Sequence, residues 1–153
     1  MSDTMMRVAA FAVVLTLFVS MNAYAADTEE TPASADLTDL DTARQLVDGQ
    51  QYEEALPLLL HLDEKGRSNP DVLNLIGFSL RKTGKMADAL GYYQRALALD
   101  PEHLGANEYL GELYLEIKQP AKAKERLAVL QKACGDCEEF EDLQAQIDRY
   151  AAQ

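Results

Sequence analysis

The feature that most constrains this chain is an internal repeat of 34 residues. Ala55, Ala89 and Ala123 stand 34 residues apart, and Gly77 and Gly111 have the same separation. Small residues that recur at a fixed long period indicate a repeated supersecondary unit, in which each copy buries its apolar face against the next. Three consecutive copies are predicted, at about 36–69, 70–103 and 104–137.

The middle copy is the clearest, and it reads PDVLNLIGFSLRKTGKMADALGYYQRALALDPEH from Pro70. Gly77 and Ala89 are small enough to let two helices approach closely, and Gly84 can end the first helix with a positive φ angle. Together with the larger apolar positions, they resemble the tetratricopeptide repeat, a helix-turn-helix unit. The matching residues are Leu73, Ile76, Gly77, Leu80, Gly84, Ala89, Tyr93, Ala96 and Pro101. The resemblance implies an all-α solenoid of three such repeats.

Seven helices are predicted, at 38–48, 52–62, 71–82, 86–99, 104–117, 120–133 and 137–150. Asn69 and Asp100 each precede a proline, which is typical of an N-cap followed by the first helical residue. The last helix has large apolar residues at spacings of three and four, a pattern that suits a C-terminal capping helix over the open end of a solenoid. They are Phe140, Leu143, Ile147 and Tyr150.

The N-terminus has the pattern of a secretory signal peptide over residues 1–25. Arg7 precedes an apolar run from Val8 to Val19, and Ala23 and Ala25 form an A-x-A cleavage pattern. The run is short for a membrane span, so cleavage after Ala25 is favoured over an uncleaved anchor. The expected product is a periplasmic protein with no membrane insertion, an acidic disordered linker over 26–35, and a repeat domain over 36–153.

The charge of the chain argues against several classes of partner. The formal net charge is −12, and cleavage of the leader leaves it unchanged because the leader holds one acid and one base. Nucleic acid and anionic lipid surfaces are therefore not expected to bind, since their phosphates would be repelled. The acid is concentrated in the two flanks, whereas the middle of the chain is nearly balanced.

The residues offer no diagnostic catalytic site, so an enzyme, a cofactor and a metal are not expected. The chain has two histidines, His61 and His103, which lie in different repeats and are most simply surface residues. Cys134 and Cys137 form a C-x-x-C pair at the junction before the last helix. In an oxidising compartment such a pair favours a structural disulfide, with a redox pair and a metal site as the alternatives. The neighbouring acids argue against a stabilised thiolate.

The resemblance also places a partner-binding groove on the first helix of each unit. Phe78 is the expected apolar anchor, because no core role is obvious for it among Asn74, Arg81 and Lys82. The predicted groove residues with polar or aromatic side chains are Arg44, Asn74, Phe78, Arg81, Lys82, Glu108 and Glu112, flanked by Leu40, Val47, Asp48, Leu115 and Glu116. Arg81 and Lys82 are expected to face solvent and meet acid on the partner, and the glutamates to meet base.

These observations predict a periplasmic adaptor or scaffold that binds a segment of a protein partner in its groove. A thiol-redox helper that uses the CGDC pair is one alternative. A structural subunit of an envelope complex, bound through another surface, is the other.

Overall fold

The 34-residue period corresponds to pairs of helices in a computed structural model, which describes residues 32–152 and the side-chain surroundings from residue 38 to 152. That part of the chain contains seven helices and no strand. The helices are α1 (Pro32–Asp48), α2 (Tyr52–Glu64), α3 (Pro70–Lys82), α4 (Met86–Leu99), α5 (Leu104–Glu116), α6 (Pro120–Ala133) and α7 (Glu138–Ala151). The all-α repeat fold predicted from the sequence is confirmed.

The predicted boundaries agree with the helices to within two residues except at the N-terminus. The sequence predicts a first helix from residue 38 and a disordered linker over 26–35, but α1 begins at Pro32. Proline suits a first helical turn because the N–H that it lacks has no partner there, and Ala33 and Ala35 have high helix propensity. Residues 1–31, with the predicted signal peptide and the rest of the linker, lie outside the described residues.

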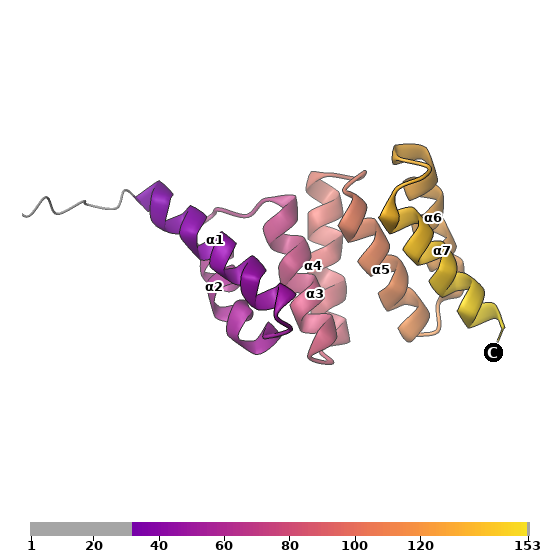
Figure 1. The fold of residues 1–153 in the computed structure, drawn as a ribbon, viewed down its shortest axis with the longest axis horizontal. Helices are drawn as coiled ribbons and strands as arrows, with labels where there is room; N and C mark the ends of the chain where they lie inside the picture. The colour runs from indigo at the N-terminus through magenta and orange to yellow at the C-terminus, as the bar shows by residue number, and fades with distance from the viewer. Residues whose placement is uncertain (1–31, 153) are drawn as a thin grey trace, which may run out of the picture.

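The helices form two layers (Figure 1). The first helices of the units, α1, α3 and α5, lie in a row that α7 continues, and neighbours in this row approach within 8 Å between Cα atoms. The second helices, α2, α4 and α6, do not approach one another in this way. The stack is therefore tighter on the side of α1, α3, α5 and α7, and we call that side the concave face.

Small residues allow the closest helix contacts. A Cβ atom added to Gly77 of α3 would lie 2.8 Å from ring carbons of Tyr93, which is fully buried in α4. The equivalent Gly111 of α5 does not meet α6 in this way, because position 127 is a leucine rather than a tyrosine. The absence of a Cβ atom at Gly111 leaves room for Leu143 of α7, because a Cβ atom added there would lie 2.5 Å from the Leu143 side chain. One small residue thus serves the contact within a unit, and the other serves the contact with the last helix.

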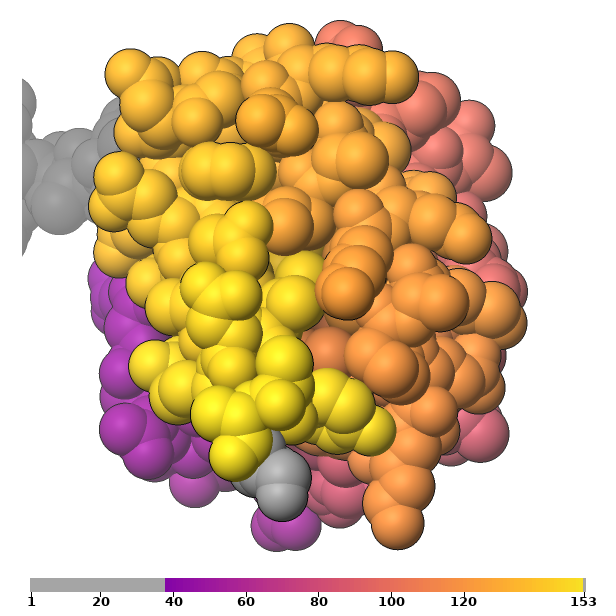
Figure 2. Space-filling view, turned by 90° about the vertical axis from the view of Figure 1, so that its right-hand side faces the viewer, coloured from indigo at the N-terminus to yellow at the C-terminus, as the bar shows by residue number. Residues whose placement is uncertain are grey.

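The C-terminal helix covers the end of the stack, as Figure 2 shows for α6 and α7. Leu143 and Ile147 are buried against α5 and α6, and Phe140 and Tyr150 are half-buried. Between α6 and α7 an open depression of about 400 Å³ has Leu127, Phe140 and Ile147 among its lining residues. Among residues 32–152, no helix has the length and apolar character that crossing a bilayer requires.

The turns inside the three units share one backbone conformation. Gln50, Gly84 and Lys118 stand at the same position of successive units, and their φ angles are 60°, 81° and 60°. Only glycine adopts this left-handed conformation without a steric cost. Gly84 confirms the predicted end of its helix, whereas Gln50 and Lys118 hold a conformation that is unfavourable for a residue with a Cβ atom.

We therefore predict that Lys118→Gly stabilises the protein. Relief of the left-handed strain is worth about 1 kcal/mol, less the extra freedom that glycine has in the unfolded chain. Thermal unfolding followed by circular dichroism should show a melting temperature about 2–5 °C higher. Gly84→Ala should lower it, and an equal fall in both variants would contradict this explanation of the turns.

Candidate functional site

The predicted groove residues lie on α1, α3 and α5, the helices of the concave face, but in different environments. Phe78, Arg81, Lys82 and Glu112 form one connected group around the contact between α3 and α5. Arg44 lies apart, near the start of α3. Asn74 and Glu108 are buried at equivalent positions of successive repeats, and each is 7% exposed.

Phe78 lies between two tyrosines that sequence reasoning did not select. Its ring centroid is 5.8 Å from that of Tyr52, in an edge-to-face arrangement, and 4.6 Å from that of Tyr109. All three rings are half-buried, so they form a partly exposed aromatic cluster at the start of α2 and on α3 and α5. Tyr109 could have been selected from the sequence, because it lies one helical turn before Glu112, a predicted groove residue. Tyr52 could not, because it starts α2 and contacts Phe78 only when the repeats are stacked.

Arg81 corrects the sequence-based prediction, because it is not available to a partner. Only 3% of its side chain is exposed, and its guanidinium donates to Glu112 Oε2 at 2.5 Å and to Glu116 Oε1 at 2.7 Å. Gln146 of α7 donates to the other oxygen of Glu112 at 3.2 Å. The cation and the acids that were expected to meet a partner therefore neutralise one another and connect α3, α5 and α7.

Lys82, in contrast, is exposed as predicted. Its ammonium lies 5.1 Å from the centroid of the Phe78 ring, a distance at which cation and ring attract one another. Lys82 and Tyr52 also line an open depression of about 390 Å³ beside the turn between α1 and α2. This part of the concave face thus offers one free cation beside an aromatic surface.

Two buried acceptors on the concave face lack donors. The Asn74 Oδ1 atom is sealed from solvent and has no hydrogen-bond partner. Its amide nitrogen occupies the space beside Gly105, where a Cβ atom would lie 3.0 Å away. Among the described residues, no hydrogen bond or ion pair is made by the carboxylate of Glu108. Burial, and then repulsion by Glu112, raises the pKa of Glu108 to about 8.

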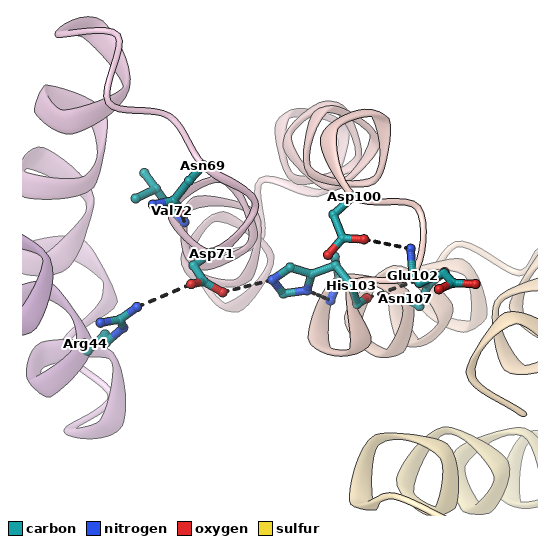
Figure 3. Close-up of polar contacts among 9 residues, drawn as sticks. Arg44, Asn69, Asp71, Val72, Asp100, Glu102, His103 and Asn107 are labelled. Carbon is teal, nitrogen blue, oxygen red and sulfur yellow. Dashed lines mark hydrogen bonds and ion pairs between the residues drawn. The ribbon is translucent and has the colours of Figure 1, made fainter. Parts of the chain in front are cut away.

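The edge of the concave face carries a polar chain across three repeats (Figure 3). Arg44 of α1 reaches Asp71 of α3 at 3.6 Å, and the other oxygen of Asp71 lies 3.0 Å from His103 Nε2. His103 Nδ1 accepts from the Ala106 amide at 3.1 Å, so the imidazole caps α5. A neutral His103 therefore carries its proton on Nε2 and donates it to Asp71.

This edge also corrects two expectations about single residues. His103 is not simply a surface residue, since it is the N-cap of α5. Asp100 was predicted to be that cap, but its carboxylate accepts from the Glu102 amide in the preceding turn (Figure 3). Pro101 belongs to that turn, and the helix begins only at Leu104. Asn69, in contrast, caps α3 as predicted, because its side chain accepts from the Val72 amide at 2.8 Å.

The sulfur atoms of Cys134 and Cys137 lie 2.03 Å apart at the junction between α6 and α7, a bonding distance for a disulfide. Gly135 between them has a φ angle of 74°. Among the described residues, no three His, Cys, Asp or Glu side chains form a group that could hold a metal ion.

The fold and one stretch of the sequence are similar to known proteins. Residues 80–147 match a family model described as "Tetratricopeptide repeat". No curated protein sequence matches the chain significantly. Among solved structures, the first TPR of Spaghetti (RPAP3), bound to an HSP90 peptide, has a TM-score of 0.69 at 15% identity, with 82% of this chain and 99% of that chain covered.

Two bacterial structures are similar to a comparable degree. The Yersinia enterocolitica type III secretion chaperone SycD, in complex with a peptide of the translocator YopD, has a TM-score of 0.66 at 16% identity, with 81% of this chain and 94% of that chain covered. A tetratricopeptide repeat protein from Parabacteroides merdae has a TM-score of 0.67 at 16% identity, with 80% of this chain and 47% of that chain covered.

The burial of Arg81 predicts different effects for two neighbouring cations. Arg81→Met should destabilise the protein by about 2–3 kcal/mol, because it leaves the partly buried Glu112 without its cation. Lys82→Met removes an exposed cation and should change the free energy of unfolding by less than about 0.5 kcal/mol. Urea denaturation of both variants measures the difference. Equal stability of the two would show that the Arg81 ion pairs contribute little.

Proposed function

We propose that this chain is a tetratricopeptide-repeat protein and that it acts as a non-enzymatic interaction module whose concave face binds a segment of a partner protein. The observation that carries the proposal is the aromatic cluster of Tyr52, Phe78 and Tyr109, whose rings are in contact and only half-buried. Partly exposed aromatic side chains on a rigid scaffold are frequent anchors of protein interfaces. The repeat fold supplies that rigid scaffold.

The solved structures support this class of function. The Spaghetti and SycD structures each hold a peptide. Both proteins share the repeat fold with this chain, so the same backbone can present a surface to a peptide. The proposal for this chain rests on its own residues, because the identity to either protein is too low to carry over individual contacts.

The cluster indicates what the bound segment should contain. Phe78 and the two tyrosines suit an apolar or aromatic side chain, which would be packed between rings. Lys82, the exposed cation at 5.1 Å from Phe78, suits an acid close to that side chain. Arg81 and Glu112 orient the helices on either side of the cluster rather than contact the partner. The segment is therefore expected to place an apolar residue beside an acid.

We also propose that the protein acts after export, in the periplasm of a double-membraned bacterium. The proposal rests on the A-x-A pattern that ends at Ala25 and on the apolar run before it. In that compartment the Cys134–Cys137 pair serves as a structural clip between α6 and α7. The acids beside Cys137 disfavour a reactive thiolate, so redox chemistry is the less favoured use of the pair.

Export and the clip are tested together by expressing the full chain in such a bacterium. The periplasmic fraction should contain a product whose N-terminal sequence begins at Ala26. Trapping with a maleimide reagent should find no free thiols in that product before reduction and two after reduction. A mixed population of oxidised and reduced protein in the periplasm would instead favour the redox alternative.

The concave-face proposal is tested with a phage library of random twelve-residue peptides, panned on the purified protein. Phe78→Ala should weaken the binding of the selected peptides about 5- to 150-fold, mostly through faster dissociation, because a buried anchor is lost. Surface plasmon resonance measures both rates. Leu99→Ala is the matched control, since Leu99 of α4 is 59% exposed and lies outside the aromatic cluster.

Peptides that bind Phe78→Ala as tightly as the wild-type protein would contradict the proposal. The depression between α6 and α7 at the C-terminal end would then become the surface to examine, and the structural-subunit alternative would gain support. Circular dichroism of each variant confirms that the fold is retained.

A further inference from the structure

Glu108 is a buried acid of the predicted groove that the fold leaves without a partner among the described residues. It is 7% exposed, and no hydrogen bond or ion pair reaches its carboxylate. Arg81 is the cation that acts to lower the pKa of Glu108, but its guanidinium already forms ion pairs with Glu112 and Glu116. A buried carboxylate without a donor is unfavourable, and such groups are normally satisfied.

The equivalent position of the preceding repeat also holds a buried polar side chain that lacks a donor. Asn74 stands 34 residues before Glu108 and is equally buried, and its Oδ1 atom has no donor. The concave face thus presents two buried acceptors in the same register of successive repeats. Of the two, the Asn74 oxygen is sealed from solvent, so Glu108 is the acceptor to which a ligand can supply a donor.

The charges around Glu108 show what kind of donor would be favoured. Glu112 of its own helix and Glu139 and Asp142 of α7 all repel its charge, and Arg81 of α3 is the cation that opposes them. Tyr109, beside it on α5, is uncharged near neutral pH, because burial, and then repulsion by Glu108 and Glu112, raises its pKa to about 12. The surroundings therefore favour a positive charge.

We propose that the concave face holds, beside the aromatic cluster, a subsite on α5 and α7 that binds one lysine or arginine side chain of the partner segment through Glu108, with Glu139 and Asp142 around it. This inference rests on the proposed function, since it names a second feature of the same bound segment. Glu139 is half-buried and Asp142 is exposed, so the subsite opens to solvent from the α7 side. The acids do not form a group that could hold a metal ion, which favours an organic cation.

Binding of a cation at the subsite is coupled to the release of a proton from Glu108. Without a ligand the pKa of Glu108 is about 8, so the carboxyl holds a proton over much of the neutral range. A bound cation favours the ionised form and lowers this pKa, so binding releases the proton. Affinity for a basic segment is therefore expected to rise with pH, by on the order of tenfold between pH 6.5 and 8.5.

The experiment compares peptides selected from the twelve-residue library at pH 8.5 on the wild-type protein and on Glu108→Gln. Wild-type selections should be enriched in lysine or arginine at a fixed distance from an apolar residue, and Glu108→Gln selections should not. A selected peptide is then paired with its lysine-to-norleucine or arginine-to-citrulline analogue. The charged peptide should lose about tenfold in affinity on Glu108→Gln and should no longer respond to pH, whereas the neutral analogue should bind both proteins equally.

Glu125→Gln is the matched control, because Glu125 is an exposed acid of α6 on the other layer. It should keep both the affinity and the pH response, so a response that comes from His61 or His103 would persist in all three proteins. Peptides that require Phe78 but show no basic enrichment and no Glu108 dependence would overturn the subsite and leave the proposed function intact. Peptides that require neither Phe78 nor Glu108 would overturn both.

Discussion

The spacing of this solenoid depends on places where one helix has almost no side chain. Gly77 lets the ring of Tyr93 lie directly against the backbone of α3, and Gly111 does the same for Leu143 and α5. An added methyl group at either position would overlap the neighbouring side chain. Protein interiors are too densely packed to absorb such an overlap without movement of a helix. The positions of the rings and charges on the concave face follow from these two approaches.

Because the helices approach so closely, charges on neighbouring helices can satisfy one another. Arg81 bridges α3 to α5 and is held there by two carboxylates and by the rings of Phe78 and Tyr109. Its burial is tolerated because each terminal nitrogen has an ionised acceptor. The concave face is consequently less charged than its composition implies, and what remains available is aromatic surface, Lys82 and the unpartnered Glu108.

The fold could be predicted from the sequence because the features that specify it lie within single repeats and recur from one repeat to the next. The 34-residue period, the small residues and the N-cap at Asn69 each act within one unit, and six of the seven helices begin within one residue of their expected positions. The start of α1 was missed because Pro32 and its neighbours show no apolar pattern, although they are compatible with a helix. His103 was missed as a cap because its role depends on the turn at Asp100.

The site was less predictable, because it depends on contacts between units. The burial of Arg81 follows from acids that lie on the next first helix, and a helical pattern on α3 alone cannot distinguish that environment from solvent. Tyr52 belongs to the start of α2 and joins Phe78 only when the units are stacked. The sequence pattern placed residues on the right helices, but the partners of each side chain came from the superhelical packing.

Ion pairs on opposite sides of the stack also affect how easily it bends. Arg95 of α4 forms two hydrogen bonds with Asp63 of α2, at 2.9 and 2.7 Å, where the second helices otherwise stand apart. Arg44, Asp71 and Arg81 join the first helices on the other side. Bending the first two units in either direction lengthens one of these contacts, and the two-fold contact of Arg95 with the partly buried Asp63 resists it more than the exposed pair of Arg44 and Asp71. An incoming segment therefore meets a surface that is partly ordered in advance, and less conformational entropy is lost when it docks.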